Sequence, residues 1–443
     1  MSANTRSEKR AAVLWDESFL WGLVACRALK KAGLDFSLIN ANDIRQGALA
    51  DYRLLYVPGG WASNKLKALG EQGAMMIKRF IERGGSYFGV CGGAGLATSE
   101  GLGLLPIKRK PLEQRVPSLS GKITAAICPH PVWKGISGPR AKFHIWWPSQ
   151  MEPGKNDKSM KIKILAAFDA ATEDTFSSDL SVADTPDIGR MERAYGLNLD
   201  PGRMCGSPLV MEGAYGAGRV FISLIHFDTP GDVNGRRALK NLWDFFGCGR
   251  AICPEDKNKK QKNGRAGGRA ARKFLFSVLS EPVEELYQFG LRNFLWFPRG
   301  WVIQWRRGVR GLEYFTLREM VREMASSPGA GEISAGEIEA LAGGLRNFCE
   351  KAKKLLMQER LALQEGRAIT FSNASSDEMA ELRMELFSGS KSHGGQFKIL
   401  LDKIDALLCR ALKAEELHPL PTLSLKGEGL TKGGIAPLVK SPT

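Results

Sequence analysis

The stretch Gly84-Gly85-Ser86-Tyr87-Phe88-Gly89-Val90-Cys91-Gly92-Gly93-Ala94-Gly95 places one cysteine where an apolar run ends and a glycine-rich segment begins. This pattern is typical of a nucleophile elbow, in which a tight strand-to-helix turn holds a reactive side chain above the edge of a sheet. Small neighbours are required because the backbone folds back sharply there. We expect a helix over 94–101, whose first N–H groups would favour the thiolate of Cys91. The alternative is a buried cysteine at the end of an ordinary strand.

Length and composition indicate two folded regions. The chain has 443 residues, of which 43% are hydrophobic, and this is enough for a large core. The first ten residues are polar, and no later run has the roughly eighteen apolar residues of a membrane span, so we expect a cytoplasmic protein. The eight cysteines form no CxxC pair, which favours free thiols over disulfides or a zinc site. We expect no metal and no cofactor.

The formal charge of +16 is concentrated in one segment. Residues 257–273 contain eight basic residues and no acidic one, in a composition that cannot form a core. We interpret 251–273 as a solvated linker between a domain at 1–250 and a helical region at 274–415, and 416–443 as a disordered tail. A polybasic linker is weak support for polyanion binding, so nucleic acid is not an expected partner.

The first 250 residues alternate short apolar runs with helical patterns, which predicts an α/β fold with a mostly parallel sheet. Expected strands are 11–15, 36–39, 54–57, the elbow strand, 122–127, 143–147, 162–168, 208–212 and 219–225. Expected helices are 19–32, 72–82 and 234–247.

Two other segments could complete a site around Cys91. Pro58-Gly59-Gly60 follows a strand, and its N–H groups could stabilise an oxyanion together with that of Gly92. The run from Gly216 to Asp228 contains a strand, then His226, then a carboxylate two residues later. Such a histidine can accept the thiol proton, and the acid can hold the imidazole in the required tautomer. The alternatives are an ordinary strand-end turn and a polar histidine with no catalytic role.

These segments resemble the three signature segments of class I glutamine amidotransferase-like domains. They are Val57-Pro58-Gly59-Gly60, Gly89-Val90-Cys91-Gly92-Gly93, and Gly218-Arg219-Val220 through His226-Phe227-Asp228. The chain looks most similar to the branch found at the N-terminus of some biotin-protein ligases, over about residues 10–250. The resemblance implies a flavodoxin-like three-layer sandwich. It also implies Cys91 as nucleophile, His226 as base, Asp228 as its orienting acid, and Gly59, Gly60 and Gly92 around the oxyanion.

The sequence departs from that family in two ways. The family pattern His-Pro-Glu is His226-Phe227-Asp228 here, so a carboxylate from elsewhere, such as Glu17, is a second candidate. Glu17 is better explained as a solvated loop acid or as a charge at a helix N-terminus. No phosphate loop, biotin-ligase adenylate loop or synthetase domain follows. Trp61 and His144 are candidate pocket residues, and the abundance of aromatic residues near them suggests a small-molecule substrate with a flat or apolar group.

Residues 274–415 show the spacing of packing helices, over 274–297, 315–325 and 341–363. Between them, 291–305 mixes tryptophans and arginines, and we favour a buried aromatic cluster over a contact for a protein partner or membrane surface through 274–310. Two functions therefore remain open. One is a cysteine-dependent hydrolase or amidotransferase-like enzyme that acts on an amide or acyl group of a small molecule through a thioester. The other is an inactive domain of that fold whose helical half binds a partner.

Overall fold

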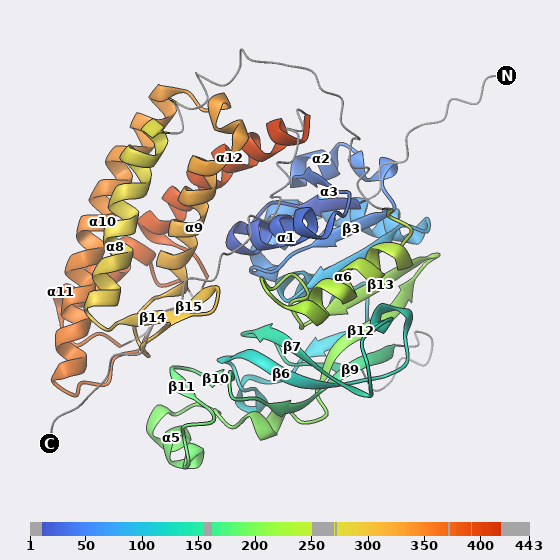
Figure 1. Ribbon diagram of the computed structural model, residues 1–443, viewed down its shortest axis with the longest axis horizontal. Helices are drawn as coiled ribbons and strands as arrows, with labels where there is room; N and C mark the ends of the chain where they lie inside the picture. The colour runs from blue at the N-terminus through green and yellow to red at the C-terminus, as the bar shows by residue number, and fades with distance from the viewer. Residues whose placement is uncertain are drawn as a thin grey trace, which may run out of the picture.

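The computed structural model describes residues 11–154, 162–249, 270, 273–370, 373–390 and 392–417. An α/β half, which ends with helix α6 (Val233–Phe245), lies beside a half made mainly of long helices (Figure 1). The predicted basic linker at 251–273 and the predicted tail at 416–443 fall almost entirely outside the described residues. No helix in the described ranges is long and apolar enough to cross a bilayer.

Five parallel strands form the centre of the sheet and carry the elbow. Their order is β2-β1-β3-β4-β13, with bounds Ser37–Ile39, Ala11–Leu14, Leu54–Val57, Ser86–Val90 and Gly218–Ser223. Most of their residues are apolar and buried, as expected for parallel strands that are covered on both faces. Helices α1 (Phe19–Ala32) and α6 pack together on one face, and α3 (Ala62–Glu82) lies on the other. The predicted α/β fold with a mostly parallel central sheet is confirmed.

Beyond β13 the sheet continues as antiparallel strands. These are β12 (Pro208–Tyr215), β9 (Lys163–Ala171), β6 (Leu119–Ile127), β10 (Phe176–Ser177) and β11 (Leu180–Ser181). Strand β7 (Arg140–Trp146) pairs with β6 and then reaches the segment that follows β13, where Ile145 and Ile225 form a bridge. Strands β5 (Ile107–Arg109) and β8 (Met151–Pro153) form a separate pair, and α2 (Ala41–Arg45) and α5 (Ile188–Tyr195) are short helices. The curl of this extension brings the end of β7 to the elbow.

Two helices near the elbow differ from the sequence-based expectation. Helix α3 begins at Ala62 rather than at residue 72, and it has a break at Gly70 (φ +63°). The expected helix corresponds to the part after this break, and the apolar pattern continues on both sides of it. Helix α4, expected over 94–101, covers only Gly92–Leu96. It ends early because the chain turns back, and the N–H of Leu102 donates to the carbonyl of Leu96 at 2.7 Å.

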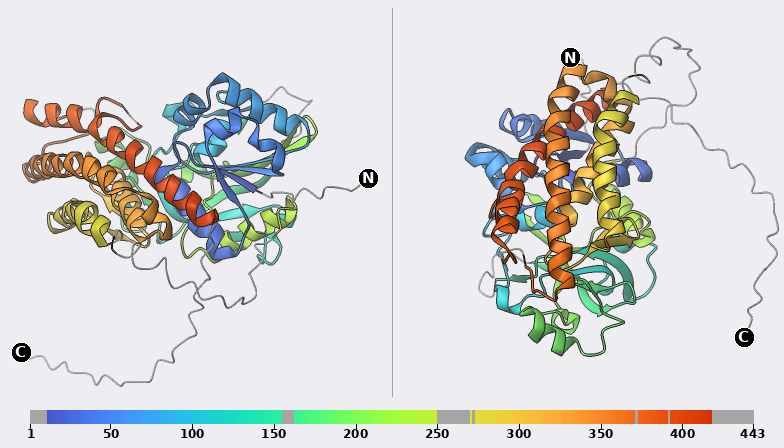
Figure 2. Two further views of the ribbon diagram at one scale, coloured as in Figure 1. Left: turned by 90° about the horizontal axis from the view of Figure 1, so that it is seen from above. Right: turned by 90° about the vertical axis from the view of Figure 1, so that its left-hand side faces the viewer.

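The helical half consists of α8 (Glu281–Arg292), α9 (Leu312–Ser326), α10 (Ala335–Gln364), α11 (Asp377–Phe387) and α12 (Gly395–Leu417). A π-helical turn, Phe276–Ser280, precedes α8, and α8 and α10 run alongside each other (Figure 2). The helix expected to reach residue 297 ends at Arg292, and a hairpin of β14 (Trp296–Arg299) and β15 (Val302–Trp305) follows. Pro298 removes a helical N–H, and Gly300 (φ +58°) allows the tight turn.

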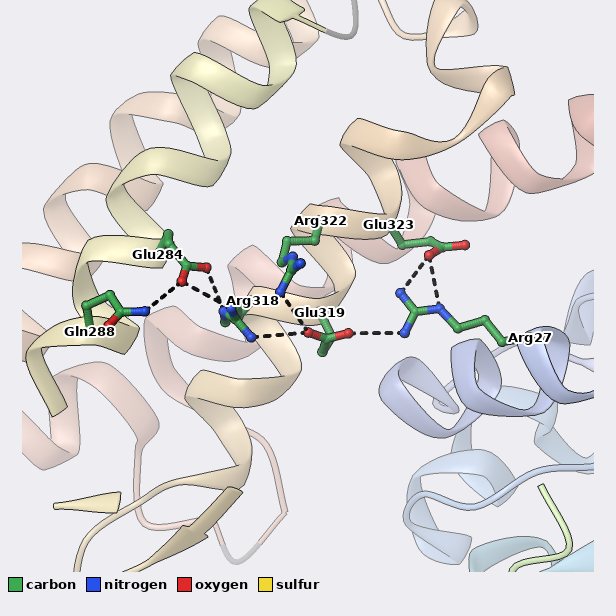
Figure 3. A network of polar contacts seen from close by, with 7 residues as sticks. All are labelled: Arg27, Glu284, Gln288, Arg318, Glu319, Arg322 and Glu323. Carbon is green, nitrogen blue, oxygen red and sulfur yellow. Dashed lines mark hydrogen bonds and ion pairs between the residues drawn. The ribbon is translucent and has the colours of Figure 1, made fainter. Parts of the chain in front are cut away.

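A chain of charged side chains joins the two halves (Figure 3). Arg27 of α1 donates to Glu319 at 3.1 Å and to Glu323 at 2.6 and 3.0 Å, both on α9. Within the helical half, Arg318 contacts Glu319 at 3.5 Å and donates to Glu284 of α8 at 2.6 and 3.1 Å. Partly exposed ion pairs of this kind contribute little stability individually, so we assign them mainly to the orientation of the two halves.

Candidate functional site

Cys91 occupies the strained turn between β4 and α4. Its φ of +50° and ψ of −101° are unusual for a residue with a side chain, and its thiol is partly exposed. The neighbouring glycines are required by contact distance: a Cβ at Gly89 or Gly93 would lie 2.4 or 2.0 Å from a backbone oxygen. The hydroxyl of Tyr87, buried in β4, donates to the carbonyl of Gly93 at 2.7 Å. The predicted elbow is therefore present as a geometric feature.

The glycine turn at 58–60 lies directly against the elbow. A Cβ at Gly92 would be 1.9 Å from the carbonyl oxygen of Gly60, whose φ is +112°. A Cβ at Gly59 would be 2.8 Å from the Trp21 side chain. The two segments that were expected to supply oxyanion donors, through the N–H groups of Gly60 and Gly92, are thus in contact.

The backbone holds His226 beside the elbow from two sides. The N–H of Cys91 donates to the carbonyl of Ser223, the last residue of β13, at 2.8 Å. The N–H of His226 donates to the carbonyl of His144 in β7 at 2.9 Å. The imidazole is fully buried, and the Trp21 ring lies 4.5 Å from it between centroids. Two strands and one aromatic side chain therefore fix the position of this ring.

Asp228 binds the imidazole through Nδ1. The distance from His226 Nδ1 to Asp228 Oδ1 is 3.0 Å, and Tyr56 donates its hydroxyl to Asp228 Oδ2 at 3.2 Å. Both carboxylate oxygens therefore accept hydrogen bonds. The hydrogen bond at Nδ1 orients the ring so that Nε2 points away from the acid. Nε2 is buried and has no hydrogen-bond partner among the described residues.

The electrostatics favour a charged imidazole. Burial lowers the pKa of His226, but the Asp228 carboxylate and, to a smaller extent, Cys91 outweigh it and raise the pKa to about 9. The influence of Cys91, through its side-chain contact and its charge, places its sulfur close to the ring, while Nε2 makes no hydrogen bond of normal geometry with any described residue. Burial and the adjacent Asp228 raise the pKa of Tyr56 well above its usual value, so this phenol stays neutral and donates.

The other candidate residues are engaged elsewhere. Glu17 accepts from Asn64 at 3.2 Å and pairs with Lys398 of α12 at 2.9 Å, so its carboxylate is part of the contact between the two halves. The His144 ring is 2.7 Å from Asp232, and only its backbone oxygen contacts His226. Trp61, at the start of α3, is 43% exposed. The structure brings together Cys91, His226 and Asp228 but does not bring these three side chains to them.

Lys65 is a buried residue near the site that the sequence analysis did not identify. Its Nζ donates to Ser18 Oγ at 2.5 Å and to the carbonyl of Asp16 at 3.1 Å. Burial lowers its pKa to about 7, although Glu17 and Asp16 oppose that shift. Its Cε lies 3.4 Å from where a Cβ of Gly60 would be, so Lys65 supports the glycine turn. The available signal was its helical spacing with Leu69 and Gly73, on the buried face of α3.

The described cysteines differ in exposure. Cys26, Cys248 and Cys349 are buried, Cys128 and Cys205 are exposed, and Cys91 and Cys409 are intermediate. In the described part of the chain, no group of three or more His, Cys, Asp or Glu side chains is arranged to hold a metal ion. The exposed thiols provide internal references for the reactivity of Cys91.

Residues 37–101 match the family model described as biotin-protein ligase, N terminal. The matched segment contains the glycine turn at 58–60 and the elbow with Cys91, and it stops before His226 and Asp228. No curated protein sequence matches this chain.

Several solved structures share the fold of about half of the chain. They include PurLQS from Thermotoga maritima (17% identity, 54% of this chain and 99% of that chain, TM-score 0.37). A glutamine amidotransferase from Thermotoga maritima matches at 10% identity, over 55% of this chain and 84% of its own, with a TM-score of 0.32. A β-galactosidase from Bacillus circulans sp. alkalophilus matches at 14% identity, over 55% and 32%, with a TM-score of 0.35. The family-model match bears out the predicted similarity to the biotin-protein ligase N-terminal family over residues 37–101.

Proposed function

We propose that this protein is a cysteine-dependent enzyme of the amidotransferase or hydrolase type, which acts on an amide or acyl group of a small molecule. The observation that carries the proposal is the orientation of His226. Asp228 occupies its Nδ1, while Nε2 is buried, makes no hydrogen bond of normal geometry with a described residue, and lies beside a cysteine on a strained elbow. A histidine with no catalytic role would normally satisfy a buried ring nitrogen.

In the proposed reaction, the Cys91 thiolate attacks the carbonyl carbon of the substrate and a carbon–sulfur bond forms. The N–H groups of Gly60 and Gly92 stabilise the negative charge on the carbonyl oxygen. Protonated His226 donates its Nε2 proton to the leaving amine as the carbon–nitrogen bond breaks, which leaves a thioester. Neutral His226 then accepts a proton from water, or from another acceptor nucleophile, which attacks the thioester and releases Cys91.

Asp228 supports this cycle by stabilising the imidazolium. The acid is one methylene shorter than the glutamate of the family pattern, and in this structure it still reaches Nδ1 at 3.0 Å. Tyr56 fixes its second oxygen, which restricts the carboxylate to this orientation. These contacts favour Asp228 over Glu17 as the third member of the triad, since Glu17 is held by Lys398.

A burst experiment tests the proposal. Mixing the protein with p-nitrophenyl acetate should release one equivalent of p-nitrophenolate rapidly and place an acetyl group on Cys91, detectable by peptide mass spectrometry. Cys91→Ala should abolish both signals, and Cys128→Ala should leave them unchanged. Ammonia release from glutamine and from asparagine would then distinguish an amidase from an esterase. If the wild type shows no burst and no Cys91 adduct, the alternative of an inactive binding domain, with the helical half engaging a partner, is favoured.

A further inference from the structure

One tryptophan of the helical half packs among the aromatic residues around the site. Trp301 follows Gly300 at the tip of the β14–β15 hairpin, which extends from the helical half toward the antiparallel strands (Figure 1). Its ring lies 6.0 Å from Trp21 at an interplanar angle of 76° and 5.4 Å from Trp146 at 89°. Both contacts are edge-to-face, a favourable geometry for aromatic pairs. The indole of Trp301 therefore packs against both rings.

Trp301 also packs against Phe315 of α9 at 6.2 Å between ring centroids, but its other two ring partners, Trp21 and Trp146, lie beside the proposed catalytic pair. Trp21 covers the imidazole of His226 at 4.5 Å, and the carbonyl oxygen of Trp146 is 3.9 Å from the Cys91 sulfur. The Trp146 indole is itself fixed, because its Nε1 donates to Thr229 at 2.9 Å. The side chain at residue 301 is thus in contact with one residue beside the base and one residue beside the nucleophile.

The hairpin is held against the α/β half by specific contacts. Arg299 donates to the side chain and the carbonyl of Ser120 at 2.9 Å each, and to the carbonyl of Asp174 at 2.6 Å. Gln304 donates to the carbonyl of Ser178 at 2.7 Å. Burial of this guanidinium lowers the pKa of Arg299 to about 10, which leaves it charged at neutral pH. The position of Trp301 is therefore part of the folded structure rather than a loose contact.

We propose that Trp301 is a specificity-determining residue that limits the size of the group able to reach Cys91. The helical half would then complete the substrate site, and the site would accept a compact acyl or amide group while excluding bulky ones. The inference rests on the proposed function, because it assumes that substrates react at Cys91. It adds a role for a residue that lies 75 positions beyond His226 in the sequence and outside the amidotransferase-like half.

The test compares two thiol reagents of different size on the full-length protein. Labelling rates of Cys91 are measured with iodoacetamide and with fluorescein maleimide, and the result is their ratio. In Trp301→Ala the bulky reagent should gain at least about tenfold relative to iodoacetamide, which corresponds to a barrier lower by about 1.4 kcal/mol. Trp301→Phe should stay near the wild-type ratio because it keeps a ring at this position. Phe297→Ala is the matched control, since this residue of the same hairpin is 41% exposed.

Labelling of the buried cysteines shows whether Trp301→Ala has loosened the whole fold rather than the surroundings of Cys91. Cys26 in α1 and Cys349 in α10 should stay protected from both reagents, and new labelling at either would contradict a local role for Trp301. If Trp301→Ala does not fold, Trp301→Leu gives the same comparison with a smaller loss of packing. An unchanged ratio in the folded variant would overturn the proposal. A wild-type Cys91 that reacts no faster than the exposed Cys128 would instead contradict the proposed function.

Discussion

Replacing Asp228 with asparagine removes one negative charge from the imidazole while keeping a similar shape. With a pKa of about 9, His226 is protonated in a ratio of about 30 to 1 at pH 7.5. Without the carboxylate, burial is opposed only by the smaller influence of Cys91, so we expect the pKa of His226 to fall to its ordinary value of about 6.5 or below. At pH 7.5 no more than about one ring in ten would then be charged. The imidazolium population should therefore fall at least about tenfold.

Two measurements read out this change. The pKa of His226, followed by NMR of the labelled ring, should move from about 9 in the wild type to about 6.5 or below in Asp228→Asn. Alkylation of Cys91 by iodoacetamide at pH 7.5 should slow by about tenfold, since the thiolate loses its neighbouring cation. Thermal melting checks that the variant is folded. A wild-type ring that titrates near 6.5, or a variant that keeps the wild-type alkylation rate at pH 7.5, would refute this account of the site.

Further predictions concern the supports of the site. Because the pKa of His226 is raised, the stability that its charged form contributes is complete below about pH 6.5 and is lost as the pH rises through about 9. Over that interval the melting temperature of the wild type should therefore fall more than the melting temperature of Asp228→Asn. Gly92→Ala should cost at least about 2 kcal/mol of unfolding free energy in urea titrations, because its Cβ meets a backbone oxygen at 1.9 Å; a near-neutral effect would show that the turn at 58–60 can move away. Tyr56→Phe should lose about 1–3 kcal/mol by the same assay, since it leaves one oxygen of Asp228 unpaired, and an unchanged stability would mean that water replaces the phenol. Arg27→Ala should change stability by no more than about 1 kcal/mol, because its ion pairs are partly exposed; a larger loss, measured at two salt concentrations, would show that these pairs hold the halves together.

The sequence predicted the parts of the site that depend on local pattern. The elbow follows from an apolar strand that runs into glycines, and the pairing of His226 with Asp228 follows from their spacing after a strand. The acid was the weaker part of that prediction because its family counterpart is a glutamate. In the structure Asp228 contacts the ring directly. Its second oxygen is bound by a tyrosine in β3, Tyr56, which no local pattern connects with residue 228. A hydroxyl in the otherwise aliphatic strand Leu54–Val57 was the signal that a buried partner was needed.

The features that the sequence did not reveal depend on contacts between distant segments. Trp21 was interpreted only as a position on the first helix, and Trp301 only as part of an aromatic cluster. Their contact depends on the docking of the helical half, and periodicity carries no information about such docking. The hairpin was missed because the helical spacing in 274–297 runs into its first strand. The residues that favour strands and a turn, Pro298 and Gly300, come only after that segment. The antiparallel return of β7, which places Trp146 at the elbow, likewise depends on long-range strand pairing.

The most direct test of a reactive Cys91 is competitive labelling of the native protein with limiting iodoacetamide at pH 7, read by peptide mass spectrometry. The site described here predicts that Cys91, although only partly exposed, takes up label at least about tenfold faster than the exposed thiols of Cys128 and Cys205, and that His226→Ala removes this advantage. Labelling of Cys91 at or below the rate of those two thiols would contradict it.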